Sequence, residues 1–380
     1  MTHQRSSTSL PFPSVTFCNL NTVRSSVVAG THADFLKWKT GENESITDNH
    51  ILMKTIEEFV DVGILTLEEM FIWCAWENKP FPCASRMREL VTRNTKCFTV
   101  NAAGASTAPL MTSGAGEENA LMLLIDIHQE ENIHFDVNYI RYGAGVDMTV
   151  HAQDAWPMTS QQGVALAPGL SHFVSMTYEE TTRLSTPYAK EECISSDDQP
   201  DYNYQKCMTG CRIEAMFHYC DCNDYSDCPY ATIFKECYNY NRREILQEKC
   251  SRCLRNCEES RYNLVTSSAV FPAKGHINDL IYYTGLNRTT EQDIRDNVLL
   301  VKLYFSTLNY EEHVGRESFD RSTLVANIGG FLGLFLGASF VTLCEIGEVL
   351  IHLAIAGVRK ITCSCQRRGP QNVKPNVTSP

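Results

Sequence analysis

The sequence predicts an α+β fold: a disulfide-rich extracellular body of β-sheet with helical segments, followed by one transmembrane helix near the C-terminus. Three observations lead to this prediction. Residues 324–344 are 21 uncharged and mostly apolar positions, and 14 of the 17 cysteines precede this run. Segments that alternate apolar and polar residues, as strands do, occur beside segments with apolar residues at helical spacing. Together they indicate a membrane-anchored protein with a large cysteine-stabilised domain.

The apolar run at 324–344 is long enough to cross a membrane. At about 1.5 Å per residue, a helix of this length spans a hydrocarbon core of roughly 30 Å. Basic residues follow the run, whereas both signs occur just before it, so the positive-inside rule places the C-terminus in the cytosol and residues 1–322 outside. The following basic residues are Arg359, Lys360, Arg367, Arg368 and Lys374, and the preceding charged residues are Arg316, Glu317, Asp320 and Arg321.

The composition excludes several classes of protein. A net charge of −12 argues against a surface that binds nucleic acid. The chain has no HExxH, GxSxG or Walker motif and no convincing nucleophile set, so we do not expect an enzyme. The cysteines before the apolar run are even in number, which in an oxidising compartment indicates a disulfide framework. We therefore expect neither a metal nor a cofactor.

The first half of the body is predicted as follows. Phe12 to Leu20 alternates and is rich in β-branched and aromatic residues, which predicts a strand that opens the core sheet. From Asp48 to Trp76, apolar residues recur at helical spacing, which predicts two helices joined at Gly63. Short strands such as KCFTV, ALMLLIDI and HFVSM follow between Cys97 and Ser175, separated by loops rich in Gly, Ala, Ser and Pro.

The second half contains a cysteine-dense module and a strand. Residues 193–257 are rich in Cys and Tyr, with helical patterns at 207–219 and 243–256, and carry too few apolar residues to fold without crosslinks. Residues 298–310 (VLLVKLYFSTLNY) predict one strand that leads toward the membrane helix. The sequons at Asn43 and Asn287 fit glycosylation outside the cell, whereas the sequon at Asn376 would lie inside and stay unmodified.

Several motifs in order resemble the epithelial sodium channel, degenerin and acid-sensing ion channel family, over residues 12 to about 353. They are FPSVTFCNLN, KCFTVN, APGLSHFVSM followed by RLSTPY, the cysteine array, LNYEE and LVANIGGFLGLFLGASFVTLCEI. The resemblance implies an extracellular body with a β-sheet palm and inner barrel, a helical finger and a helical thumb, assembled as a trimer around a pore. The boundaries it implies are an irregular N-terminus at 1–11, an extracellular domain at 12–322 (finger about 48–95, thumb about 188–260, palm strands at both ends), a pore helix at 323–353 and a cytoplasmic tail at 354–380.

The same resemblance implies a disulfide pairing that uses all 14 cysteines before the membrane. One pair belongs to the palm, one to the finger and five to the thumb, where nested pairs form a ladder between two helices. The implied pairs are Cys18 with Cys97, Cys74 with Cys83, Cys193 with Cys257, Cys207 with Cys253, Cys211 with Cys250, Cys220 with Cys237, and Cys222 with Cys228.

A stripe of small residues marks the apolar run. Ala326, Gly330, Gly333 and Gly337 share one helical face. On spacing alone, close helix packing through successive GxxxG steps is favoured over a pore. The resemblance reverses this preference, because Gly337-Ala338-Ser339 matches the tract where the family's second membrane helix breaks to form the selectivity filter, and carbonyls there replace part of the hydration shell of the permeant Na⁺.

Further roles follow from the resemblance. Ala326 falls at the degenerin position beside the outer gate, where a small side chain lets the pore close. The other implied pore-lining residues are Asn327, Gly330, Gly333, Leu334, Glu345 and Glu348. Snorkelling at the membrane interface explains Glu348 equally well. Tyr188, in RLSTPY, matches an aromatic residue at the base of the thumb that contacts the family's first membrane helix.

The chain departs from the family pattern at its start. Residues 1–10 have no apolar core, and neither the family's first membrane helix nor its cytosolic His-Gly motif occurs. We expect a truncated gene model, with a real short form or a reverse-anchored span as alternatives. The functional expectation is a subunit of a homo- or heterotrimeric, amiloride-sensitive, sodium-selective channel in the plasma membrane. The alternative is a non-conducting membrane-anchored ectodomain that modulates full-length subunits.

The sequence does not identify the stimulus that opens such a channel. Acidic pairs such as Glu68-Glu69, Glu191-Glu192 and Asp197-Asp198 would sense protons if their pKa values were raised. Solvated surfaces explain most such pairs, and we favour that interpretation. Peptide gating, mechanical gating and constitutive leak are equally compatible with the sequence.

Overall fold

The structure is a computed structural model that describes residues 2–21, 24–26, 65–91, 96–102, 108–131, 143–153, 155–219, 250–317, 321–336 and 340–366. The chain divides into two compact units, Met1–Arg316 and Glu317–Pro380. We call them the body and the C-terminal unit. The body mixes sheets with short helices and contains five disulfides among its described residues, so the predicted α+β, disulfide-rich class is confirmed.

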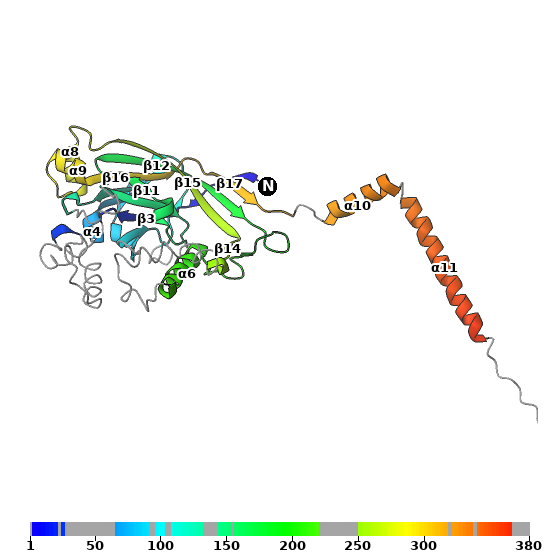
Figure 1. Ribbon diagram of the computed structural model, residues 1–380. Coiled ribbons are helices and arrows are strands. Elements are labelled where there is room, and N and C mark those ends of the chain that lie inside the picture. The colour runs from blue at the N-terminus through cyan, green and yellow to red at the C-terminus, as the bar shows by residue number, and fades with distance from the viewer. Residues whose placement is uncertain are drawn as a thin grey trace, which may run out of the picture. The chain divides into compact units, whose positions relative to one another are not determined.

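An eight-stranded sheet forms the largest part of the body (Figure 1). Its strand order is β1-β17-β12-β16-β9-β4-β5, with β15 paired to β12 outside this path. β12 is the central element: it is antiparallel to β15 along its whole length and parallel to both β16 and β17. The strands are β1 (Thr2–Ser6), β4 (Phe71–Trp76), β5 (Lys79–Phe81), β9 (Leu121–Asp126), β12 (Leu170–Thr182), β15 (Glu258–Val270), β16 (Val298–Phe305) and β17 (Asn309–Val314).

A five-stranded sheet lies against it, in the order β11-β10-β3-β7-β6. The predicted strand at the start of the chain is its central member, antiparallel to β7 and β10. Two small two-stranded sheets, β2-β8 and β13-β14, complete the described strands. The bounds are β2 (Leu10–Pro11), β3 (Ser14–Asn19), β6 (Met87–Val91), β7 (Lys96–Val100), β8 (Met111–Thr112), β10 (Val146–His151), β11 (Val164–Leu166), β13 (Cys193–Ile194) and β14 (Arg255–Asn256).

The hydrophobic core lies between the two sheets. Phe12, fully buried, makes edge contacts with Trp76 and with Phe305 of β16, at ring-centroid distances of 4.7 and 5.9 Å. Phe71 of β4 contacts Phe17 and Phe98 of the smaller sheet in the same way, at 5.8 and 5.6 Å. Aromatic pairs of this geometry add to the gain from burial, so the FPSVTFCNL segment connects the two layers.

Short helices flank the sheets. α8 and α9 lie together at one end of the large sheet, and α6 lies near β14 (Figure 1). The predicted helix at 207–219 is confirmed within α6. Of the second helical pattern, residues 243–249 lie outside the described residues, and residues 250–256 form the short 3₁₀ helix η5 (Cys250–Arg252) followed by β14. The helical elements among the described residues of the body are α4 (Leu67–Met70), η1 (Cys83–Ser85), η2 (Glu117–Asn119), η3 (Gln129–Glu131), α5 (Thr159–Gln162), α6 (Tyr204–Tyr219), η5 (Cys250–Arg252), α8 (Ile277–Thr284) and α9 (Glu291–Asn297).

Two predictions for the body are wrong in part. Residues 71–76 are strand β4 and not helix, and the rest of the predicted helical region up to residue 64 lies outside the described residues. β4 packs one face on the main core and turns Ile72 and Trp73 toward a second cluster around Ile294. A strand buried on both faces loses its alternation, so its apolar run resembles that of a buried helix.

The predicted strand at 298–310 is two strands. β16 ends at Phe305, and β17 begins at Asn309, whose N–H donates to Thr307 Oγ1 at 3.1 Å. Such a local side-chain bond competes with the strand ladder. The interruption lets β16 pair with β9 while β17 pairs with β1.

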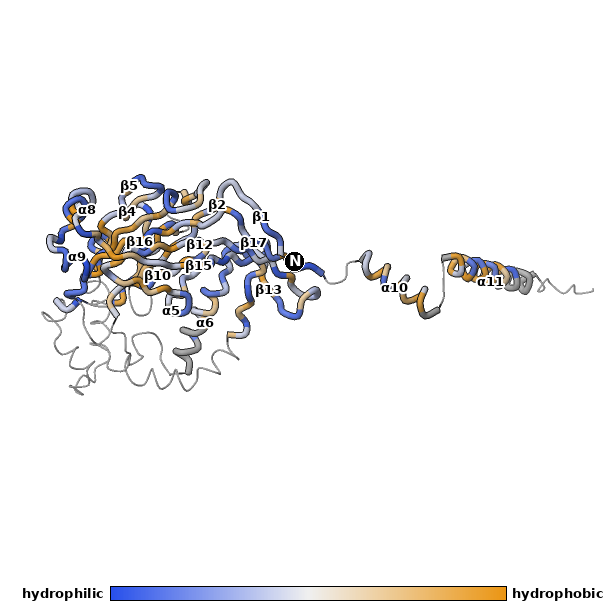
Figure 2. Tube along the Cα trace, turned by 90° about the horizontal axis from the view of Figure 1, so that it is seen from above, coloured by the Kyte–Doolittle hydropathy of each residue, from blue (hydrophilic) through white to orange (hydrophobic). Residues whose placement is uncertain are grey.

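The C-terminal unit contains two apolar helices. They are α10 (Arg321–Leu336) and α11 (Phe340–Gln366), and Figure 2 shows apolar residues along both. Among the described residues, the helix long and apolar enough to span a membrane is Val341–Arg359 in α11, whereas the apolar part of α10, Ser322–Leu334, is shorter. The apolar run 324–344 is therefore shared between α10 and α11, and residues 337–339, where the resemblance implies a break, lie outside the described residues.

Candidate pore segment and the cleft beside Tyr188

The small-residue stripe lies on α10. Ala326, Gly330 and Gly333 follow one another at helical spacing on this helix, and all three are exposed in the single chain. A Cβ atom added at Gly330 or Gly333 would meet no atom within 4 Å. Nothing within the described residues therefore requires glycine for packing at Gly330 or Gly333.

Two other predicted pore residues lie beside the stripe. Asn327 and Leu334 are seven residues apart on α10, and both are exposed, Leu334 to 77%. They flank the small residues on an adjacent face of the helix. α10 therefore presents small, polar and apolar side chains in neighbouring rows.

The predicted filter residues Gly337, Ala338 and Ser339 lie outside the described residues. α10 ends one residue before this tract and α11 begins one residue after it. Further along, Glu345 and Glu348 are both exposed on α11. In the single chain, all of the predicted pore residues that the structure describes are exposed to solvent.

A cleft of about 570 Å³ lies beside Tyr188 in the body. Tyr188 is 63% exposed, and its N–H donates to the carbonyl of Ser185 at 3.0 Å. The cleft is lined by residues from three parts of the chain, and positive side chains outnumber negative ones among them. The charged lining residues are Arg183, Lys190, Glu191, Glu192, Arg255 and Arg316, and the imidazole of His313 lies among them.

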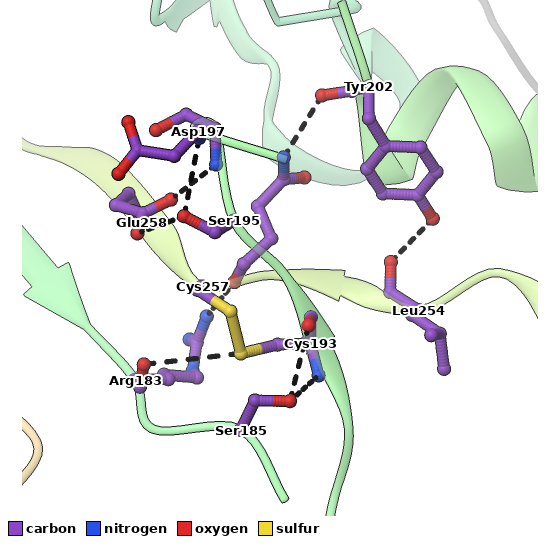
Figure 3. Close-up of a disulfide and its surroundings, with 11 residues drawn as sticks. Arg183, Ser185, Cys193, Ser195, Asp197, Tyr202, Leu254, Cys257 and Glu258 are labelled. Carbon is purple, nitrogen blue, oxygen red and sulfur yellow. Dashed lines mark hydrogen bonds between the residues drawn. A yellow bond between two sulfur atoms is a disulfide. The ribbon is translucent and has the colours of Figure 1, made fainter. Parts of the chain in front are cut away.

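The disulfide Cys193–Cys257 supports one wall of the cleft (Figure 3). The hydroxyl of Ser185 accepts from the N–H of Cys193 at 3.2 Å and lies 3.3 Å from its carbonyl. The Arg183 guanidinium donates to Glu259 Oε2 at 2.5 Å and to the carbonyl of Asn256 at 3.2 Å. These bonds hold the Tyr188 loop against the start of β15.

His313 of β17 lies at the other wall. Its Nε2 is 3.2 Å from Glu179 Oε1 and 3.5 Å from Glu311 Oε2, and its Nδ1 is 3.0 Å from the hydroxyl of Thr2. These three partners come from β12, β17 and β1. The imidazole therefore connects three neighbouring strands where the chain leaves the sheet.

Nested disulfides are present in the predicted thumb. Cys207 and Cys211, one turn apart on α6, bond to Cys253 and Cys250. With Cys193–Cys257, Cys18–Cys97 and Cys74–Cys83, the structure contains five of the seven implied pairs. The other two implied pairs, Cys220 with Cys237 and Cys222 with Cys228, lie outside the described residues.

Glu69, one member of a predicted acidic pair, does not have the raised pKa that proton sensing would need. Burial raises the pKa of Glu69, but hydrogen bonds from Arg24 and from Thr66 outweigh it and lower the pKa to about 2. Glu69 is the N3 residue of a capping box at the start of α4, with Thr66 as N-cap. This carboxylate is structural.

Sequence reasoning missed an ionic cluster around Arg288. The side chain is 9% exposed and contacts Asp126 Oδ2 at 2.5 Å, Glu130 Oε1 at 2.8 Å and Asp293 Oδ1 at 2.5 Å. Asp126 is 162 residues away in sequence, so no local pattern reveals the pair. The neighbouring Asn287, a predicted glycosylation site, is exposed, whereas Asn43 lies outside the described residues.

A family model and several curated relatives all relate this chain to one family of ion channels. The family model described as amiloride-sensitive sodium channel matches residues 1–349. Acid-sensing ion channel 1B of Danio rerio is 27% identical over 393 residues, which covers 98% of this chain and 69% of the relative. Acid-sensing ion channel 1 of Gallus gallus is 28% identical over 375 residues, covering 89% and 70%. Acid-sensing ion channel 2 of Homo sapiens is 28% identical over 384 residues, covering 91% and 73%.

Proposed function

The chain belongs to the amiloride-sensitive sodium channel family, and from this premise we propose that it is one subunit of a trimeric, sodium-selective channel blocked by amiloride. The family consists of plasma-membrane ion channels and not of enzymes, so the protein is an ion-channel subunit. The proposal adds the ion, the stoichiometry and the orientation: the body outside, the C-terminus in the cytosol.

The observation that carries the proposal is the division of the apolar run. α10 ends at Leu336 and α11 begins at Phe340, so two helices flank Gly337-Ala338-Ser339. A helix that ends inside a membrane leaves carbonyl groups that need partners, which is tolerated only where they face protein or water. In a ring of three chains, these carbonyls and the Ser339 hydroxyl would take the place of water around Na⁺.

The exposed stripe on α10 supports a pore-facing surface above this tract. A larger side chain at Ala326 would prevent the pore from closing. Gly330 and Gly333 would keep the side chains on the same face of α10 small. Glu345 and Glu348 on α11 would raise the cation concentration at the inner mouth. By the family resemblance, Tyr188 would contact the family's first membrane helix.

A single set of recordings tests the proposal. The full chain is expressed in cells without a related current, alone and with a related subunit, and membrane current is measured while external Na⁺ is replaced by a large organic cation. We expect an inward Na⁺ current that amiloride blocks. Current in neither setting would contradict the proposal, and a change only in the related subunit's current would favour the modulating ectodomain.

The gate residue is tested with a matched neighbour. Ala326→Phe should hold the channel open and increase the standing current at least several-fold, because the larger side chain cannot pass its counterparts in a closed pore. Val325→Phe places the same side chain on a different face of α10 and should change the current little. Equal effects of the two substitutions would show that Ala326 does not line the gate.

The orientation is tested by glycosylation. Asn287→Gln should remove one glycosidase-sensitive step in mass from the full chain, because Asn287 is exposed on the body. Asn376→Gln should leave the mass unchanged, because residue 376 would lie in the cytosol. The opposite pattern would invert the topology.

A further inference from the structure

The titratable side chains of the membrane-spanning segment lie on one face of α11. Between Val341 and Arg359 these side chains, other than that of Cys344, are Glu345, Glu348, His352 and Arg359. At 3.6 residues per turn their directions fall within an arc of about 60°. The remaining faces carry exposed apolar side chains such as Ile346, Leu350, Ile351 and Leu353.

In a membrane, this arrangement determines which face of α11 turns away from the lipid. Charged side chains within a span turn toward protein or water, because burying them in hydrocarbon is costly. The apolar faces suit lipid or neighbouring helices. His352 therefore shares one face of α11 with Glu345 and Glu348, and in a channel this face would turn toward water. His352 was not selected from the sequence.

Glu348 and His352 form a close pair on this face. His352 Nε2 lies 3.8 Å from Glu348 Oε1, at the i, i+4 spacing of one helical turn, and the two side chains are 73% and 75% exposed. An exposed pair of this kind stabilises a helix only slightly, because solvent screens the interaction. Helix stability alone therefore gives little reason for the pair.

The pair is shaped for a borderline transition-metal ion. Zn²⁺ takes an imidazole nitrogen and a carboxylate oxygen at about 2.0–2.2 Å, which in a tetrahedral site separates the two ligand atoms by about 3.3 Å. The two atoms in α11 need to approach by only about 0.5 Å, which exposed side chains achieve by small torsional changes. Mg²⁺ and Ca²⁺ prefer oxygen ligands, so the imidazole distinguishes the metal class.

We propose that Glu348 and His352 of α11 form a Zn²⁺-class site at the cytosolic side of the pore. The inference rests on the proposed channel for its effect on current, but metal binding itself does not require conduction. Each chain supplies two ligands, and no group of three metal-binding side chains occurs within the part of the chain that is described. Water or the equivalent pair of a second subunit completes the coordination.

Binding is tested on the full chain purified in detergent. Cys344, Cys363 and Cys365 are replaced by alanine in every variant, so that thiolates do not compete for the probe, which is Zn²⁺ itself. We expect His352→Ala to weaken one class of Zn²⁺ sites at least 10-fold in a calorimetric or competitor-dye titration. The matched control, His352→Ala with Ile351→His, moves the imidazole by about 100° around the helix and should not restore binding. Unchanged affinity in His352→Ala, or restoration by the control, would overturn the proposal.

Current gives an independent result. Zn²⁺ applied to the cytosolic face of an excised patch should reduce the current, and His352→Ala should raise the half-blocking concentration at least 10-fold. The same change with Zn²⁺ at the outer face only would overturn the cytosolic placement. A chain that binds Zn²⁺ through His352 but carries no current would reject the channel proposal and retain the site. A chain that carries the current but binds Zn²⁺ equally well with and without His352 would retain the channel and reject the site.

Discussion

The body and the C-terminal unit differ in where their side chains find partners. In the body, Phe12, Phe17 and Phe98 are almost completely buried among residues of the same chain. In the C-terminal unit, none of the membrane-spanning window is buried, and Leu334 and Val341 are more than 60% exposed. The body therefore contains the information for its own fold, while the C-terminal unit is composed for lipid and for other helices.

The largest expected effect concerns the disulfides of the body. Cys18 and Cys97 are buried partners on β3 and β7, 79 residues apart. Replacing both with alanine should lower the free energy of unfolding by about 4 kcal/mol, because the unfolded chain gains the freedom of a long loop. Thermal unfolding of the detergent-purified chain measures this loss. Cys344→Ala, at the exposed free thiol of α11, is the comparison and should change the melting temperature little.

The ionic cluster around Arg288 should be nearly as sensitive. Arg288→Ala leaves Asp126, whose side chain is 3% exposed, as a buried charge without its main partner, and should cost about 3 kcal/mol. Arg5→Ala breaks an ion pair whose arginine is 58% exposed and should change the free energy of unfolding little, because solvent screens the pair. Similar losses for both variants in the same unfolding experiment would contradict the importance of burial here.

Two glycines sharpen the contrast between the units. Gly145 has a φ of +146°, and a Cβ there would lie 2.2 Å from the carbonyl oxygen of Leu166, so Gly145→Ala should destabilise the body by about 2 kcal/mol. Gly330 has open space around it. Gly330→Ala should leave unfolding of the body unchanged and alter only assembly or current. A stability loss from Gly330→Ala would show that α10 packs on its own chain.

The smallest expected effect is a pH dependence. Burial lowers the pKa of His172, so the imidazole stays neutral in the folded body and must take up a proton on unfolding. Stability should fall by about 1 kcal/mol or less as the pH drops below 6.5, the pKa of an unfolded histidine. His172→Gln should remove this part of the pH slope of the melting temperature. A pH slope that His172→Gln leaves unchanged would contradict this assignment.

Local pattern predicted much of the body. β3, β7, β9 and β12 lie where alternating or β-branched segments indicated strands, and α6 follows its helical spacing. β4 was not predicted, because a strand covered on both faces loses the alternation that identifies it. The break between β16 and β17 was also missed, since it depends on a turn at Thr307 and on which strands lie alongside.

The candidate site divides in a similar way. The small residues of α10 and the acidic residues of α11 were found, because helical spacing is visible in a sequence. Arg288 with Asp126, and His313 with Glu179, were not found, because each pair joins segments far apart in the chain. His352 could have been predicted, because a helical wheel of positions 341–359 places it on the same face as Glu345 and Glu348.

The pairing of β12 with β17 has a mechanical consequence. The two strands are parallel over residues 179–182 and 311–314, and the chain continues from β17 toward α10. A pull on the end of β17 along the strand axis would act across the hydrogen bonds of this pairing, which are perpendicular or slanted to the strands and would share the load. Antiparallel β1 would share the same load from the other edge of β17. A pull in that direction would load the strands in shear, so a displacement of β17 would act on β12 and β1 together and not on one hydrogen bond at a time.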